Sequence, residues 1–153
     1  MKKNLLPFII TVCLISFSCN EKSERPKTAE ELKLELALQE EENPTQYIKA
    51  VDVKMKENKI QTRNATLFRS SKHKIDGSII SGTIKNSATI AKFKDVVLTV
   101  TFMSQTGTVI EQKDYVIYEF YQPKSSKPFE LKVYEPKATE NYNVEVKNAV
   151  ATN

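Results

Sequence analysis

Few side chains in this sequence have the chemistry that catalysis or metal binding requires. The 153 residues include 1 His, His73, and 2 Cys, Cys13 and Cys19. A functional histidine needs a carboxylate or metal partner, and one His with the nearby Asp76 does not make a metal site. We therefore expect His73 to be an exposed, ordinary histidine. The sequence predicts no catalytic residue, no metal and no cofactor.

The aspartates are scattered along the chain, one to a segment: Asp52, Asp76, Asp95 and Asp114. A pair of carboxylates is the requirement of glycoside hydrolysis, but aspartates at strand ends usually bond the backbone of turns. No GxGxxG or GxxxxGK pattern for a phosphate-binding loop is present. These features together predict a protein that is not an enzyme.

One aromatic cluster is a candidate for binding. Tyr115, Tyr118 and Tyr121 lie close together in the sequence, and Lys124 follows them. An exposed aromatic face bordered by lysine can bind a glycan or a protein. The alternative is that both faces of this segment are covered, one by a second sheet and one by the predicted helix.

Residues 1–18 have the pattern of an export signal. Lys2 and Lys3 form a positively charged start, and residues 5–17 form an apolar stretch of about 13 residues. A bilayer-spanning helix needs roughly 20 residues, and Pro7 also disfavours one. We therefore predict a cleaved signal peptide, with an uncleaved anchor as the alternative.

Cys19 stands where such a signal would be cut. Ser16 and Ser18 place small residues three and one positions before it, and a polar, charged run follows from Asn20. This pattern resembles the lipoprotein signal, in which the cysteine after the cut carries lipid and becomes the mature N-terminus, although Ser16 replaces the preferred Leu. The resemblance implies a membrane anchor at Cys19 and a cell-envelope location, periplasmic or surface-exposed. An ordinary signal-peptidase cut before Cys19 is the alternative.

The predicted cut also sets the number of thiols and the net charge of the mature chain. It removes Cys13, so the mature chain has a single thiol and the fold is predicted to hold together without a disulfide. It also removes Lys2 and Lys3, which changes 23 basic residues against 19 acidic ones to 21 against 19. A mature charge of +2 does not indicate nucleic-acid binding.

A spacer and a short helix are predicted after Cys19. Residues 20–27 are polar, and Thr28 with Glu31 three positions later forms a capping-box pattern. The helix is predicted over residues 28–42 and ends at Asn43-Pro44, because the residue before Pro is pushed out of the helical region. The expected domains are therefore 1–18, 19–43 and 44–153. The helix is expected to rest on its own domain, with docking to a partner or dimerisation as the alternative.

From residue 47 onward, short β-branched and aromatic stretches alternate with turn residues. This pattern predicts a mainly β fold, an immunoglobulin-like antiparallel β-sandwich preceded by the short α-helix and the lipoprotein signal peptide. A hairpin turn is expected at Gly107, and Gly82 inside a strand indicates a bulge or a close backbone approach. The strands are expected at residues 47–55, 60–68, 78–86, 92–104, 108–112, 114–121, 129–134 and 142–150.

Alternation along these strands predicts a core. Separately, Asn86 follows the strand that contains Gly82, and its side chain is expected to bond the backbone of the adjoining turn. The predicted core consists of Val51, Ile80, Ile84, Val96, Leu98, Val100, Phe102, Val116, Tyr118, Phe129, Leu131, Val144 and Val146.

A series of these features follows in a familiar order, namely residues 81–88, 93–102 and 106–110, then Pro123 and residues 129–131. The series resembles FxLYD-type β-sandwich domains of bacterial envelope proteins, and the start at Cys19 is similar to Bacteroidetes-type lipoproteins. The resemblance implies an extracytoplasmic accessory module with no catalytic residues to carry over. We expect a lipid-anchored, non-enzymatic protein that presents its sandwich as a structural or protein-interaction module. A glycan-binding or small-ligand-binding accessory protein is the alternative.

Overall fold

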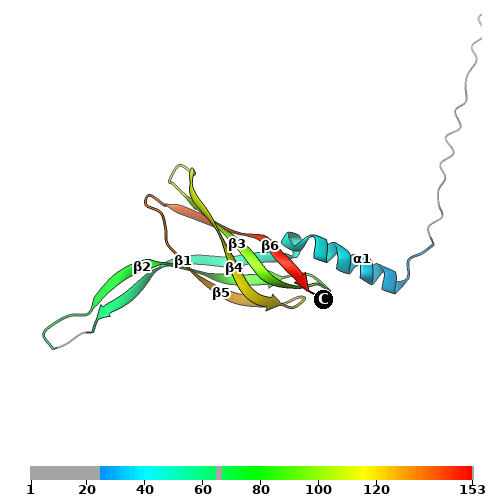
Figure 1. Cartoon of the computed structure of the whole chain (residues 1–153), viewed down its shortest axis with the longest axis horizontal. Helices are drawn as coiled ribbons and strands as arrows, with labels where there is room; N and C mark the ends of the chain where they lie inside the picture. The colour runs from blue at the N-terminus through cyan, green and yellow to red at the C-terminus, as the bar shows by residue number, and fades with distance from the viewer. Residues whose placement is uncertain (1–24, 65–66, 153) are drawn as a thin grey trace, which may run out of the picture.

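The computed structural model describes residues 25–64 and 67–152, which form two helices and six strands. The predicted signal peptide and Cys19 lie outside the described residues. The chain folds into two packed antiparallel sheets with a helix projecting from one end (Figure 1). The elements are α1 (Ala29–Glu42), α2 (Pro44–Tyr47), β1 (Ile48–Arg63), β2 (Lys72–Asn86), β3 (Lys92–Met103), β4 (Val109–Tyr121), β5 (Ser126–Val133) and β6 (Asn141–Thr152).

The predicted helix and its cap are confirmed. The Thr28 hydroxyl accepts a hydrogen bond from the Glu31 amide at 3.2 Å, and the Glu31 carboxylate accepts one from the Thr28 amide at 2.8 Å. This reciprocal pair satisfies donors that the first turn leaves free. The helix ends at Asn43, directly before Pro44. Across residues 25–64 and 67–152, no helix is both long and apolar enough to cross a bilayer.

The sheets have the orders β1-β2-β5 and β4-β3-β6, and every pairing is antiparallel. Two hairpins, β1–β2 and β3–β4, each stay within one sheet. The connections from β2 to β3, β4 to β5 and β5 to β6 pass from one sheet to the other. The predicted mainly β sandwich with a short helix is therefore confirmed.

Two predicted strand divisions are wrong. A β-bulge takes up the irregular residues where β1 pairs with β2, and β4 pairs regularly with β3 through residues 112–114. Strand β1 is continuous over Ile48–Arg63, where two strands were expected, and β2 begins at Lys72 rather than at residue 78. Asp76 and Gly77 do not open the strand; they form a bulge in it opposite Asn58, with Gly77 at φ +76°. A bulge absorbs an extra residue without ending the pairing. Strand β4 is likewise one strand where two were expected.

A second bulge changes which side of β1 faces the core. Ile48 and Ala50 pack inward, and after Asp52, at φ +54°, Val53 and Met55 do so. The pairing of β1 with β2 shifts at this point. The prediction of Val51 as a core residue is therefore wrong, because strict alternation was assumed through the bulge.

The interior is built mainly from β2, β3 and β5, whose inward side chains are fully or almost fully buried. The confirmed members are Ile80, Ile84, Val96, Leu98, Val100, Phe102 and Phe129, and Leu131, Val144 and Val146 pack half-buried against them.

Val116 and Tyr118 are exposed, so the prediction that they belong to the core is wrong. Their neighbours Tyr115 and Ile117 face inward instead, because they pair with Leu98 and Val96 on β3. Both faces of β4 are apolar, and periodicity alone does not show which one the second sheet covers.

The close approach predicted at Gly82 is confirmed. Gly82 pairs with Phe129, and a Cβ at this position would lie 2.9 Å from Cε1 of that ring and 3.1 Å from the carbonyl oxygen of Val51. The Phe129 ring thus occupies the space that a side chain would take. The hairpin turn at Gly107 is also confirmed, with φ +81°.

Candidate functional site

The residues of the predicted binding surface do not share one exposed face of strand β4. Tyr118 is 80% exposed, Tyr115 is half-buried against the core, and Tyr121 is 0% exposed. Lys124 is exposed in the turn after the strand, at φ +54°. Tyr121 is therefore corrected from a surface residue to a core residue, and of the predicted set only Tyr118 and Lys124 are exposed.

The burial of Tyr121 changes its chemistry. Its hydroxyl is buried without a hydrogen-bond partner among the described residues. Burial, assisted by the negative charge of Glu119, raises the pKa of Tyr121 to about 12. A phenol in this setting is a packing residue and cannot contact a ligand.

An exposed apolar surface nevertheless remains on the outer side of the second sheet. Phe120 on β4, Lys94 on β3 and Val150 on β6 lie in one row across the three strands. Val116 and Tyr118 precede Phe120 on the same strand. We call the exposed side chains of Val116, Tyr118, Phe120 and Val150 the aromatic patch.

Polar contacts border the aromatic patch. Lys127 from β5 forms an ion pair with Glu119 at 2.8 Å, and its hydrogen bond holds the pKa of Glu119 below the usual value. Farther along the sheet, the Thr99 hydroxyl donates to Asp114 at 2.7 Å. Lys147 also pairs with Asp114 and, through its hydrogen bond, lowers the pKa of this carboxyl group. The patch is thus a group of apolar side chains with the half-buried Lys94 between Phe120 and Val150 and with ion pairs at its border.

The predicted role of Asn86 is confirmed, and it extends to the turn that carries Lys124. The buried Asn86 side chain donates to the carbonyl oxygens of Ala91, Tyr121 and Gln122 at 3.0–3.1 Å and accepts from the amide of Ala88 at 2.9 Å. These bonds tie the β2–β3 loop to the end of β4. One side chain therefore fixes the position of the turn beside the patch.

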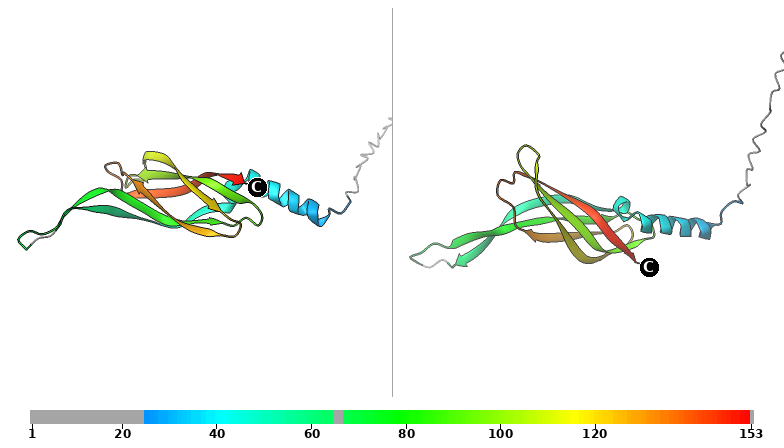
Figure 2. Two further views of the ribbon diagram at one scale, coloured as in Figure 1. Left: turned by 60° about the horizontal axis from the view of Figure 1, so that its bottom comes forward. Right: turned by 45° about the horizontal axis from the view of Figure 1, so that its top comes forward.

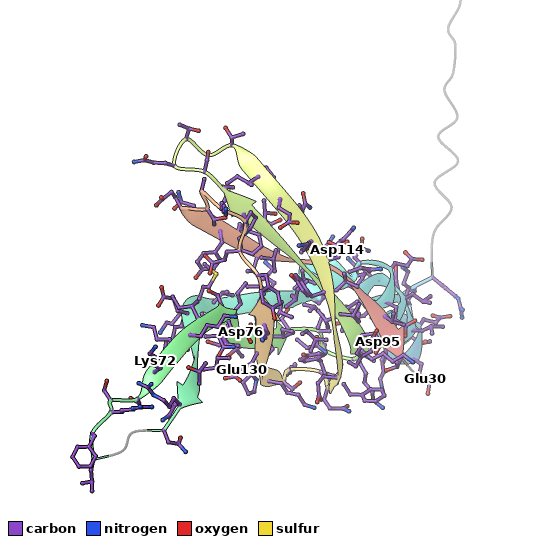
Figure 3. The ribbon with its side chains drawn as sticks, turned by 60° about the vertical axis from the view of Figure 1, so that its left-hand side comes forward. Glu30, Lys72, Asp76, Asp95, Asp114 and Glu130 are labelled. Carbon is purple, nitrogen blue, oxygen red and sulfur yellow. The ribbon has the colours of Figure 1, made fainter. Side chains whose placement is uncertain are left out.

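The aspartates do not form a catalytic pair. Asp52 and Asp95 lie at positive φ where the strand registers shift, which is a structural role. Asp76 lies on β2, and Asp114 lies on β4 in the other sheet, well apart in Figure 3. His73 is exposed, as expected. Within residues 25–64 and 67–152, no three His, Cys, Asp or Glu side chains come together as metal ligands would.

The sequence did not indicate the most prominent surface feature. Strands β1 and β2 continue as a two-stranded ribbon beyond the end of β5, whose last pair is Val133 with Ser78. We call residues 58–64 and 67–76 the arm. It projects away from the sandwich in every view, at the end opposite to helix α1 (Figures 1 and 2). Leu67 and Phe68, near its tip, are 97% and 95% exposed.

The base of the arm is held to the sandwich by charged and polar contacts. Asp76 forms an ion pair with Lys132 on β5, and the hydrogen bond from Lys132 lowers the pKa of Asp76. Lys132 also lies 5.2 Å from the centre of the Tyr134 ring. Figure 3 shows Asp76 where the ribbon leaves the sheet and Lys72 farther out.

Helix α1 is joined to the sandwich by a carboxylate that sequence reasoning missed. Glu40 is 1% exposed and accepts hydrogen bonds from the backbone amides of Thr89, Ile90 and Ala91 at 2.6, 2.8 and 2.8 Å. Burial alone would raise the pKa of Glu40, but these amide donors outweigh it and hold the pKa below its usual value. Leu32, Leu34 and Leu38 are exposed and Leu36 is half-buried, so α1 contacts the domain mainly through its last turn.

Comparisons with known proteins give no further assignment. The chain matches no protein family, no curated protein and no solved structure.

Proposed function

We propose that this protein is a lipid-anchored, non-enzymatic component of the cell envelope that presents a β-sandwich as a protein-interaction module. The single observation that carries the interaction role is the aromatic patch, in which three successive outward positions of β4, Val116, Tyr118 and Phe120, are apolar and exposed. Exposed apolar and aromatic side chains gathered on one strand, with charged groups beside them, are typical of protein contacts.

The rigidity of the platform supports this function. The patch lies on a three-stranded sheet whose inner face is the packed core, so its side chains need little ordering when a partner binds. Aromatic residues contribute most to such contacts because each one buries a large area at a small cost in side-chain entropy.

The anchor is part of the proposal through Cys19. A cysteine placed directly after an export signal is the basis for lipidation, and the resemblance to FxLYD-type domains is consistent with an envelope module. In this proposal the polar residues 20–27 and helix α1 separate the domain from the lipid.

Site-specific photo-crosslinking in intact cells tests the interaction surface. A photoreactive phenylalanine replacing Tyr118 or Phe120 should give discrete cross-linked products, whereas the same group replacing Tyr134, an exposed tyrosine outside the patch, should not. Identical products from all three positions, or no products from the two β4 positions, would refute the proposed contact.

Two further measurements test the remaining parts of the proposal. Metabolic labelling with palmitate should mark the wild-type chain and not a Cys19→Ala variant, and an unlabelled wild-type chain would exclude the anchor. Binding on a glycan array that is lost in Tyr118→Ala would favour the glycan-binding alternative. The burial of Tyr121 has already removed one of the rings on which that alternative depended.

A further inference from the structure

We propose that the tip of the arm binds anionic phospholipid membranes, with Leu67 and Phe68 entering the bilayer interface and the surrounding basic side chains contacting lipid headgroups. This contact involves a different surface from the aromatic patch and does not depend on the proposed function or on lipid at Cys19.

The tip has the first property that interfacial binding requires, which is apolar surface that no other described residue covers. Leu67 and Phe68 are adjacent and almost completely exposed, at the far end of a ribbon that projects from the domain. Exposure of a Leu and a Phe together is unfavourable in water, and complete transfer of each to an apolar environment is favourable by roughly a factor of ten or more.

The charge of the arm identifies the kind of surface that it would contact. The arm carries five basic residues, Lys59, Arg63, Arg69, Lys72 and Lys74, and one acidic residue, Asp76. The acidic group is already paired with Lys132 at the base, away from the tip. Positive charge behind an apolar tip matches the headgroup layer of an anionic bilayer, where each Lys or Arg raises the affinity roughly fivefold.

Local bonds join the two strands of the arm near Leu67 and Phe68. Arg63 donates to the carbonyl oxygen of Ser70 at 3.0 Å, and Thr62 donates to the carbonyl oxygen of Lys72 at 3.2 Å. The guanidinium group of Arg63 is thus held beside Ser70, two positions after Phe68, and Arg69 and Lys72 lie within four positions of Phe68 in the chain. This order of apolar end and basic collar is the one that interfacial anchors use.

The size of the tip favours a lipid surface over a folded protein. A stable protein contact buries about 800 Å² on each partner, and a two-residue apolar tip on a narrow ribbon is much smaller than that. A bilayer requires no matching pocket, because its interface accepts any apolar group accompanied by positive charge.

Vesicle sedimentation tests the inference with the predicted mature chain, which starts at residue 19 and lacks the apolar residues 5–17, and which carries Cys19→Ala so that lipid on Cys19 cannot contribute. This chain should bind vesicles of phosphatidylglycerol and phosphatidylethanolamine, bind phosphatidylcholine vesicles much more weakly, and lose affinity as salt concentration rises. Leu67→Ser with Phe68→Ser should lower the affinity about 100-fold, since a tenfold change corresponds to about 1.4 kcal/mol. Arg69→Gln with Lys72→Gln should lower it roughly 30-fold.

Matched controls separate the tip from general apolar or charge effects. Leu34→Ser with Leu38→Ser removes two exposed leucines from α1, and Lys33→Gln with Lys137→Gln removes the same charge elsewhere. Both controls should retain wild-type affinity.

Fluorescence gives a second readout, because the chain contains 0 Trp. Phe68→Trp should shift to shorter wavelength with anionic vesicles, and Tyr134→Trp, exposed near the base of the arm, should not shift.

Three results would overturn the inference. The first is a chain that does not bind anionic vesicles, and the second is binding that the tip substitutions leave unchanged. The third is self-association without vesicle binding that the tip substitutions abolish, since this would assign the arm to a protein contact.

Discussion

Replacement of Glu40 by Gln should detach helix α1 from the sandwich. The carboxylate of Glu40 accepts three backbone amides of the β2–β3 loop, with Oε1 bonded to Thr89 and Oε2 bonded to Ile90 and Ala91. Glutamine keeps one oxygen acceptor, but its NH₂ group would face an amide N–H that it cannot satisfy.

The expected loss follows from these three bonds. Hydrogen bonds to a charged acceptor contribute about 1.5–3 kcal/mol each, roughly twice the neutral value. Glu40→Gln weakens two bonds and breaks the third, which costs about 3 kcal/mol in total. Release of the helix limits the loss, because the freed loop amides can then bond to water.

The same contact should depend on pH. The pKa of Glu40 is below its model-peptide value of 4.5 in the folded chain. A group whose folded pKa is lowered stabilises the protein above the unfolded pKa, and this contribution disappears as pH falls through the folded value. Docking of α1 should therefore be complete at neutral pH and weaken below about pH 4.5.

Hydrogen exchange is the direct assay. In Glu40→Gln at neutral pH, the amides of residues 89–91 should exchange faster than in the wild type, and acid should have less additional effect. Glu42→Gln, an exposed carboxylate on the same helix, is the control and should change stability by no more than about 0.5 kcal/mol. If the two variants are indistinguishable, Glu40 does not hold the helix.

Three more substitutions test the interior, each by urea denaturation. Asn86→Ala removes the bonds to the carbonyl oxygens of Ala91 and Tyr121 and the acceptor of the Ala88 amide, whereas the carbonyl oxygen of Gln122 keeps its bonds from Ser125. The substitution should destabilise by about 3–5 kcal/mol, and a loss below about 1 kcal/mol would contradict its linking role. Tyr121→Phe removes a buried hydroxyl that has no partner among the described residues, so it should leave stability unchanged or raise it by about 1 kcal/mol; a clear loss would indicate an unseen bond. Gly82→Ala should cost about 1–3 kcal/mol because its Cβ meets the Phe129 ring, and Phe129→Leu should recover part of this loss if the ring is the obstacle.

Local patterns were the part of the fold that could be predicted. The Thr28–Glu31 cap, the end at Asn43-Pro44 and the hairpin at Gly107 depend on neighbouring residues only, and all three are confirmed. Alternation along β3 correctly identified a buried row from Val96 to Phe102, because the register shift between Val97 and Leu98 places its extra residue on β6 and leaves the alternation of β3 intact.

The errors have a common physical origin. Val51 was wrongly predicted to be in the core because alternation was continued through the bulge at Asp52. Tyr118 was wrongly predicted to be in the core because the wrong one of the two apolar faces of β4 was chosen. In both cases the side chain's environment depends on a partner strand distant in sequence. The same is true of Tyr121, whose burial removes it from the candidate site.

The sequence by itself determined the features that depend on neighbouring residues: an apolar stretch before Cys19, a capped helix, and a series of strands joined by polar turns. Only the tertiary structure decided which face of each strand is buried, that Glu40 fastens the helix to a loop about 50 positions later in the chain, and that residues 58–64 and 67–76 extend past β5 as an arm. The reason is that backbone preferences and caps act over a few residues. Burial and exposure arise instead from contacts between segments far apart in the chain.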